Sequence, residues 1–67
     1  MSVVKVIELL AQSEKSWEDA AQVALAEASK SVQNIQSIWI KDLKAEVENN
    51  KIVRFRVNAK VSFIVGK

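Results

Sequence analysis

The first stretch of the chain has the apolar pattern of a β-strand. Residues 2–10, SVVKVIELL, are β-branched and apolar, and Lys5 and Glu8 interrupt them. Val and Ile favour the extended backbone, so this pattern is better suited to a strand than to a helix. We therefore predict a strand from about Val3 to Leu9. The polar segment 11–15 ends this apolar run.

After this segment the apolar positions recur every three or four residues. Ser16 is a good N-cap, and Asp19 three residues later gives a capping box with Asp in place of the usual Glu or Gln. The pattern predicts one amphipathic helix from about Trp17 to Val32. Its apolar stripe is mostly alanine, so the helix can lie close to a sheet. The stripe contains Trp17, Ala20, Ala21, Ala24, Leu25, Ala28 and Val32.

The remainder, Ile35–Val65, is predicted to form two long strands joined at Glu48–Lys51. Asn49 and Asn50 tolerate the positive φ values that a two-residue hairpin loop needs. In this register the numbers of each cross-strand pair sum to 99, and the hydrophobic alternation then agrees on both strands.

This register predicts two different faces for the hairpin. The apolar face should cover the helix, and it holds Ile38, Ile40, Val53, Phe55, Val57, Ala59, Val61 and Phe63. The other face is mixed, and it holds Ser37, Trp39, Leu43, Arg54, Arg56, Asn58, Lys60 and Ser62. Polar, cationic and aromatic groups are concentrated on this mixed face.

Size and strand length predict self-association. The 67 residues include no cysteine, so no disulfide reinforces the small core. Strands of roughly 13 residues extend over about 40 Å, whereas a 16-residue helix covers only about 24 Å. The hairpin must overhang the helix. We expect Val53 and Phe55 near its tip to be exposed in a monomer and buried against a neighbouring subunit.

Composition narrows the classes of function. The chain has no His and no Cys, so the usual general base, the thiolate nucleophile and the best transition-metal ligands are missing, and an enzyme is not expected. The net charge of +2 is spread along the chain, which disfavours nucleic acid as a partner. No apolar run approaches the roughly 20 residues of a membrane span. We expect a soluble, cytoplasmic protein without membrane contact.

Three short motifs carry a resemblance to a known family. They are KVIEL at residues 5–9, SWEDA at residues 16–20 and KVSF at residues 60–63. Together with the alanine spacing of the helix, they resemble the dodecin family across nearly the whole chain. The resemblance implies one α+β domain over residues 1–67, a β-α-β-β subunit whose three-stranded antiparallel sheet wraps one helix. It also implies a hollow homododecamer that binds FMN or riboflavin for storage or sequestration and catalyses nothing.

The resemblance also implies where a flavin would bind. Flavin-binding members carry a Trp early in the second strand and a Gln in the third, and the corresponding positions here hold Ser37 and Arg56. Trp39 lies two positions after Ser37, so it remains on the same face of the strand. The candidate flavin-binding residues are therefore Trp39, Arg56, Ser37 and Lys60. The alternative is a dodecin-like shell without flavin that has a structural, cation-binding or other small-ligand role.

Each of these candidates also has a structural interpretation. Trp39 can pack in a subunit interface with the Lys60 ammonium over its ring. Arg54 and Arg56 can form ion pairs with Asp42, Glu46 or Glu48 instead of holding a phosphate, and ion pairing is favoured. Trp17 is predicted to pack at the start of the helix. The oxygen atoms near the hairpin turn do not match the spacing of a calcium loop, so no metal site is assigned.

Overall fold

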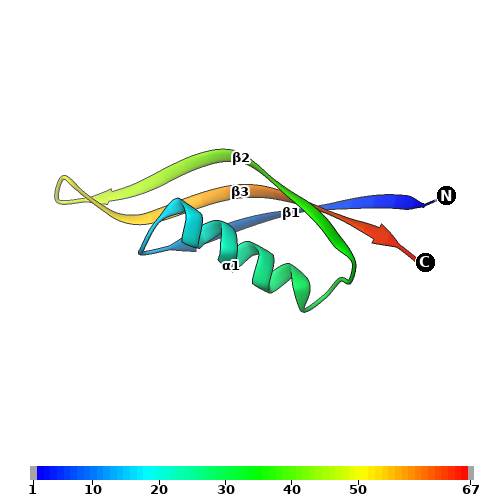
Figure 1. The fold of residues 1–67 in the computed structure, drawn as a ribbon. Helices are drawn as coiled ribbons and strands as arrows, with labels where there is room; N and C mark the ends of the chain where they lie inside the picture. The colour runs from blue at the N-terminus through cyan, green and yellow to red at the C-terminus, as the bar shows by residue number, and fades with distance from the viewer. Residues whose placement is uncertain (1, 67) are drawn as a thin grey trace.

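The computed structural model describes residues 2–66 and has one helix and three strands. The elements follow the order β1 (Val3–Ser13), α1 (Trp17–Ser29), β2 (Ile35–Glu48) and β3 (Lys51–Val65). The sheet is antiparallel with β3 in the centre, in the order β1-β3-β2. It wraps around α1, which lies across one face (Figure 1). The predicted α+β, β-α-β-β fold is confirmed.

Two predicted boundaries were wrong. Strand β1 continues beyond Leu9 to Ser13, because Ala11 and Ser13 are buried and pair with the centre of β3. Helix α1 ends at Ser29 and not at Val32. The amides of residues 30 and 31 bond to carbonyls three positions back, which tightens the last turn and ends the α-helix.

The predicted N-cap is confirmed, but the capping box is only half formed. The Ser16 hydroxyl accepts a hydrogen bond from the Asp19 amide at 2.9 Å. In a full box the Asp19 side chain would return to the Ser16 amide. Its carboxylate instead accepts a hydrogen bond from the Ser13 hydroxyl at 2.6 Å. The helix start is thus tied to the end of β1.

The predicted hairpin loop is confirmed, whereas the predicted register holds only in parts. Asn49 and Asn50 have φ values of 51° and 62°. The residue numbers of paired residues sum to 99 at the tip and again from Ile40–Ala59 to Ser37–Ser62. Between these two regions, irregularities after Ile40 and after Glu46 shift the pairing by one residue. Leu43 consequently lies opposite Val57, on the helix-facing side, and not beside Trp39 as predicted. The shift keeps an apolar residue off the mixed face.

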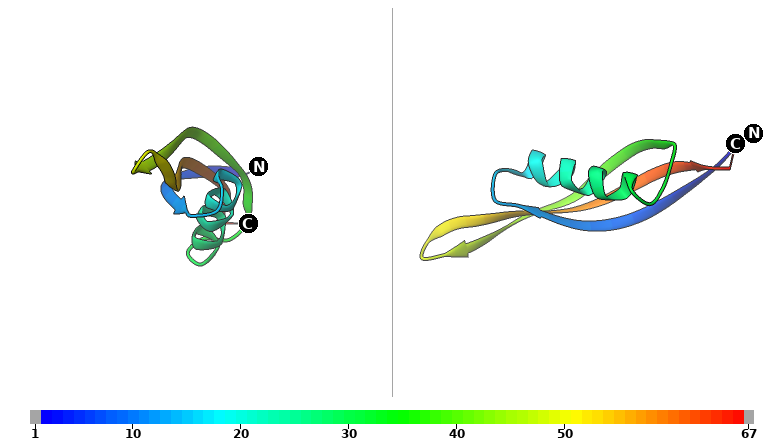
Figure 2. Two further views of the ribbon diagram at one scale, coloured as in Figure 1. Left: turned by 90° about the vertical axis from the view of Figure 1, so that its left-hand side faces the viewer. Right: turned by 90° about the horizontal axis from the view of Figure 1, so that it is seen from below.

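The core between sheet and helix is narrow. Five of its eight buried hydrophobic residues are alanines, so the helix approaches the sheet closely. They are Ala11, Ala20, Ala24, Ala28, Val57, Ala59, Val61 and Phe63. The helix covers only the middle of the sheet, and the β2–β3 tip projects beyond it on the side opposite the termini (Figure 2).

The predicted overhang of the hairpin beyond the helix is confirmed, but Phe55 is not exposed on it. The Phe55 ring packs edge-on against Trp17 at the helix start, with ring centroids 4.9 Å apart and an interplanar angle of 76°. Val53 is half-buried. The apolar side chains that are exposed at the tip are Val47 and Ile52. The prediction of exposed Val53 and Phe55 side chains was wrong. Phe55 is covered because helix α1 begins with Trp17, whose ring packs on it.

Candidate functional site

The face of the sheet away from α1, here called the outer face, is organised in rows that cross all three strands. One row consists of Val6, Ser62 and Ser37, from β1, β3 and β2. The next row consists of Glu8, Lys60 and Trp39. Direct cross-strand neighbours have side chains within contact distance. Pairing therefore brings residues that are far apart in the sequence into one small area.

These two rows form a cleft on the outer face, here called the indole cleft. It has a volume of about 370 Å³, and it is lined by Val6, Ser37, Trp39, Lys60 and Ser62. Trp39 is 62% exposed, and the Lys60 ammonium lies 5.6 Å from the centre of its ring. The Ser37 and Ser62 hydroxyls are hydrogen-bonded to each other. The structure thus brings together three of the four predicted residues, Trp39, Ser37 and Lys60.

Two lysines share one carboxylate beside this cleft. Glu8 lies in the row of Lys60 and Trp39, and its carboxylate is 3.5 Å from the Lys41 ammonium. A hydrogen bond from Asn58 and the charge of Lys41 lower the pKa of Glu8, with a smaller contribution from Lys60. Burial opposes this shift. Lys41 is the extra residue at the irregularity after Ile40, and β-bulges often re-aim side chains in this way.

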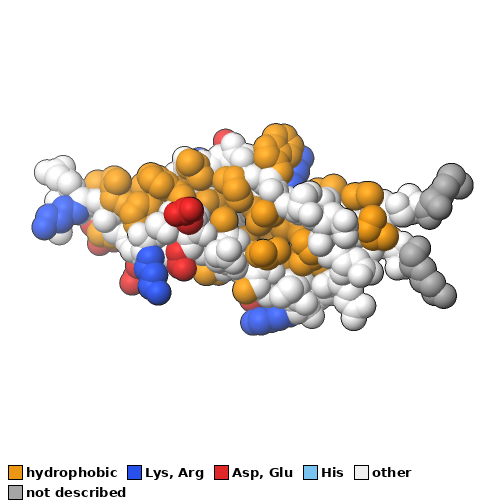
Figure 3. Space-filling view, in the orientation of Figure 1, with side chains coloured by type: hydrophobic (Ala, Val, Ile, Leu, Met, Phe, Trp, Pro, Cys, Tyr) orange, Lys and Arg blue, Asp and Glu red, His pale blue; other side chains and the backbone are white. Residues whose placement is uncertain are grey.

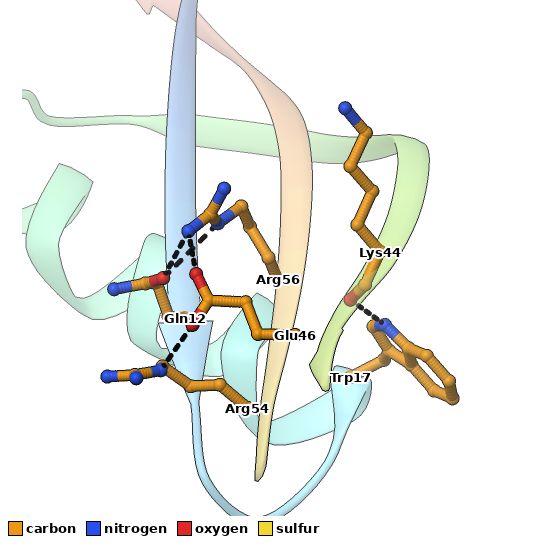
Figure 4. A network of polar contacts seen from close by, with 6 residues as sticks. All are labelled: Gln12, Trp17, Lys44, Glu46, Arg54 and Arg56. Carbon is orange, nitrogen blue, oxygen red and sulfur yellow. Dashed lines mark hydrogen bonds and ion pairs between the residues drawn. The ribbon is translucent and has the colours of Figure 1, made fainter. Parts of the chain in front are cut away.

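The fourth predicted residue, Arg56, lies outside the indole cleft. It is four positions before Lys60 on β3, which corresponds to about 13 Å along the strand. Its guanidinium donates two hydrogen bonds to the Gln12 amide oxygen, at 2.8 and 3.2 Å, and also bonds to Glu46 (Figure 4). Arg54 forms an ion pair with the other oxygen of Glu46 at 2.8 Å. The ion pairing favoured for both arginines is confirmed.

Arg56 instead lines a second, smaller depression on the outer face. This space has a volume of about 90 Å³, and it is lined by Leu10, Asp42, Lys44, Arg56 and Asn58. Residues 42 and 44 reach this face because of the register shift in β2. The group of Gln12, Glu46, Arg54 and Arg56 is here called the arginine cluster.

Trp17 packs within the chain, as predicted. Its indole N–H donates a hydrogen bond of 2.9 Å to the Lys44 carbonyl, which ties the helix start to β2 (Figure 4). Its ring meets Phe55 edge-on. Both the polar and the apolar parts of this side chain therefore have partners in the same chain.

Sequence reasoning missed four residues at or beside the cleft: Val6, Glu8, Lys41 and Ser62. Ser62 was placed on the correct face, and the predicted hairpin register already pairs it with Ser37. Val6 and Glu8 required the pairing of β1 with β3, for which the sequence carries no turn signal. Lys41 required the bulge.

The part of the chain that the structure describes has neither a metal-ligand cluster nor a membrane-spanning helix. Residues 2–66 contain no group of three or more acidic, His or Cys side chains that is placed to hold a metal ion. Near the turn, Glu46 is engaged by both arginines. Within the same range, no helix has the length and apolar character needed to cross a membrane.

Comparisons with known proteins agree with this architecture. The dodecin family model matches residues 3–66. The calcium dodecin of Mycobacterium tuberculosis is 35% identical over 63 residues, covering 94% of this chain and 89% of that protein. A crystal structure of calcium dodecin from Mycobacterium tuberculosis with a calcium-binding site matches 92% of this chain and 89% of its own, with a TM-score of 0.82 and 34% identity.

A second solved structure is closer in shape. A Thermus thermophilus protein matches all of this chain and 98% of its own, with a TM-score of 0.94 and 27% identity. The Streptomyces coelicolor dodecin has a TM-score of 0.93 at 17% identity, so it supports the fold alone. The family model spans almost the entire sequence, and the strand order and helix position follow the same fold. This chain belongs to the dodecin family.

Proposed function

We propose that this protein is a cytoplasmic, non-catalytic homo-oligomer that stores or sequesters a flavin, FMN or riboflavin, at the indole cleft. The observation that carries the proposal is the exposed indole of Trp39 above a cleft on the outer face. A Trp side chain offers a large apolar area, and its flat face is well suited to stack on a planar ring.

The surroundings of Trp39 support this role. The Ser37 and Ser62 hydroxyls are bonded to each other, which leaves both able to accept and one able to donate a hydrogen bond at the edge of a ring system. Val6 supplies an apolar wall on the other side. Stacking of a base on an aromatic side chain contributes about 1–3 kcal/mol, and a flavin ring has a comparable flat π-system. A cleft of this kind binds a flat ligand without the catalytic groups of an enzyme.

The shape of the single chain supports self-assembly. The chain exposes 5089 Å², whereas a compact monomer of 7.5 kDa exposes about 4,200 Å². Its radius of gyration is 13.7 Å, against about 11 Å for a compact domain of this length. Ten large hydrophobic side chains among residues 2–66 are exposed, and the space-filling view shows such side chains along the length of the molecule (Figure 3). Neighbouring copies would cover this surface.

A fluorescence titration tests the ligand. Stacking on Trp39 should quench the emission of riboflavin and FMN, and Trp39→Ala should weaken binding by about 1–3 kcal/mol, which is about five- to more than a hundredfold. Leu43→Ala is the matched control, because Leu43 is exposed on the same strand but pairs on the helix-facing side. If the wild type quenches neither flavin at tens of micromolar, the flavin proposal is wrong.

Native mass spectrometry tests the assembly, for which we expect twelve copies. Ile52→Asp should dissociate it, because Ile52 is 53% exposed at the tip in one chain and a carboxylate buried there would lack a partner. Phe55→Asp would not discriminate, since Phe55 packs on Trp17 within the same chain. A wild-type protein that stays monomeric at micromolar concentration would contradict the assembly.

The second candidate is a shell of the same fold that binds a cation instead of a flavin. It is favoured by the 35% identity to a protein named calcium dodecin. Residues 2–66 of one chain contain no group of three or more acidic, His or Cys side chains placed to hold a metal ion, so a calcium site would need backbone or amide oxygens beside the carboxylates, or ligands from a second copy. Calorimetric titration with calcium, repeated with magnesium as the control, separates this role from flavin binding. Calcium binding in a protein that does not quench flavin would favour the second candidate.

A further inference from the structure

The tip of the β2–β3 hairpin carries two exposed apolar side chains. The tip projects beyond α1 on the side opposite the termini (Figure 2). The irregularity after Glu46 places Val47 directly opposite Ile52, and both side chains are more than half exposed. Direct cross-strand neighbours lie side by side on one face of the sheet. The hairpin thus ends in a pair of adjacent branched apolar side chains that remain open to a contact outside the chain.

A groove between β1 and α1 offers an apolar space elsewhere on the molecule. It has a volume of about 250 Å³, and the buried Ala11 and Ala24 lie at its base. Alanine side chains end at Cβ, so they leave room above them. Leu9 and Leu10 line the groove from β1, and the exposed Val23 lines it from α1. Because β1 is an edge strand, the groove opens to the side of the molecule.

The charges at the tip and at the groove are complementary. The tip carries one cation and one carboxylate, Lys51 and Glu48. Glu27 lines the groove and pairs with Lys30 at 3.4 Å. An exposed pair of this kind contributes only about 0–1 kcal/mol, so Glu27 can exchange its partner at little cost. Lys51 of one copy can therefore pair with Glu27 of another.

The exposed area of the single chain is large enough for such a contact. The chain exposes about 900 Å² more than a compact monomer of its mass. A protein–protein interface of standard size removes about 800 Å² from each partner. The tip and the groove are different surfaces of the chain, so each copy would give its tip to one neighbour and receive the tip of another. Contacts of this head-to-tail type form a ring when the rotation between copies closes.

We propose that the tip of one copy, Val47 and Ile52, inserts into the groove between β1 and α1 of a second copy. This inference rests on the self-assembly in the proposed function. The other depressions fit the tip less well. The space beside the arginine cluster is lined by three charged side chains, and the indole cleft is assigned to the ligand. The wide space beside Asn34 is lined by uncharged residues, so it offers no carboxylate to Lys51.

Disulfide cross-linking tests this contact directly. The chain has no cysteine, so two introduced thiols are the only ones present. The variant Ile52→Cys with Val23→Cys is oxidised as the assembled protein and then separated on a denaturing gel without reductant. A disulfide requires Cα atoms about 4.4–6.8 Å apart, which insertion of the tip would provide between copies. We expect a ladder of covalent multimers that a reductant collapses to one band, because each copy is linked to two neighbours.

The matched control is Ile52→Cys with Ser29→Cys. Ser29 is exposed on the same helix, about 240° around its axis from Val23, and it does not line the groove. This variant should remain monomeric on the gel. A covalent dimer from Ile52→Cys alone would show that two tips meet each other, and it would overturn the insertion. An assembled Ile52→Cys, Val23→Cys variant that gives only monomers, with or without a disulfide within the chain, would overturn it as well.

A charge exchange tests the same contact without cysteines. Lys51→Glu and Glu27→Lys should each raise the protein concentration at which the assembly dissociates by about two- to tenfold at low salt. The two substitutions combined should restore the wild-type value, because the opposite charges meet again. If the combined variant dissociates as readily as either single one, the insertion is overturned while the assembly stands. If the wild type is monomeric at micromolar concentration in native mass spectrometry, both are overturned.

Discussion

The two tryptophans occupy regions of opposite character. At the helix start, the Trp17 indole N–H bonds to the Lys44 carbonyl, and its ring packs on Phe55. At the indole cleft, Trp39 is 62% exposed, and the Lys60 ammonium lies over its ring. The first side chain connects α1 to both strands of the hairpin. The second projects from the edge strand β2.

A structural aromatic residue can therefore be distinguished from a binding one within the same small domain. A side chain whose polar atom and ring both have partners in the chain contributes to folding. A side chain of the same type that stays exposed contributes surface for a contact outside the chain. The same distinction applies to the cations, since the arginine cluster is engaged within the chain whereas Lys60 is held weakly.

The largest expected effect is the loss of stability in Trp17→Ala. Truncation removes the edge-on contact with Phe55 and leaves the Lys44 carbonyl without its donor, so the free energy of unfolding should fall by about 2–4 kcal/mol. Urea denaturation measures this change. Trp39→Ala is the matched control, and it should change stability by no more than about 0.5 kcal/mol.

Equal losses in the two variants would contradict the comparison between the tryptophans. A large loss in Trp39→Ala alone, together with dissociation of the oligomer, would instead place Trp39 in an interface between copies. That is the structural interpretation of Trp39 already suggested by the sequence.

The next effect concerns the arginine cluster. Glu46→Gln removes the one carboxylate that both Arg54 and Arg56 contact, so two guanidinium groups remain close together without a counter-charge. All three side chains are partly exposed, and we therefore expect a loss of about 1 kcal/mol in the free energy of unfolding. Glu48→Gln at the hairpin tip is the control. Raising the salt concentration should restore part of the loss in Glu46→Gln, because it screens the repulsion.

A smaller effect is expected for Arg56→Gln. The variant keeps one ion pair of Glu46 with Arg54, so stability should fall by only about 0.5 kcal/mol. Flavin affinity should change less than twofold, since Arg56 lies outside the indole cleft. Riboflavin binding that strengthens markedly in Arg56→Gln would instead return position 56 to the ligand site, as the family pattern of the sequence suggests.

The sequence predicted the parts of the fold that depend on local patterns. The N-cap at Ser16 and the Asn49–Asn50 turn have side-chain or backbone preferences that act within a few residues, and both predictions are confirmed. The overhang of the hairpin follows from rise per residue alone. The helix end was wrong because Val32 keeps the apolar spacing after the backbone has left the α-helix.

The sequence predicted a site residue correctly only where the face of the strand on which it lies was sufficient to place it. Trp39, Ser37 and Lys60 meet because the register near them is regular. Leu43 was misplaced because a bulge changes the face of every residue up to the next irregularity. The alternation of apolar and polar residues does not reveal such a shift where charged and apolar residues are interspersed. Glu8 and Lys41 were missed because their approach depends on strand pairing and on that bulge together.

The smallest expected effect is a pH dependence that comes from the cleft. The pKa of Glu8 in the folded protein lies below its ordinary value of 4.5, mainly through the hydrogen bond from Asn58 and the charge of Lys41. A carboxyl whose pKa is lowered on folding stabilises the protein above its unfolded pKa, and this contribution is lost as the pH falls through the folded pKa. Stability should therefore decline below about pH 4.5, with a shallower decline in Glu8→Gln.

The measurement is the midpoint of urea denaturation from pH 7 to pH 3 in the wild type and in Glu8→Gln. Glu14→Gln, in the exposed connection between β1 and α1, is the control for the loss of one carboxylate. Lys41→Gln should also make the decline shallower, because it removes one cause of the lowered pKa, but the effect should be smaller since the hydrogen bond from Asn58 remains. Parallel pH profiles for the wild type and Glu8→Gln would show that the carboxylate between the two lysines does not contribute to folding.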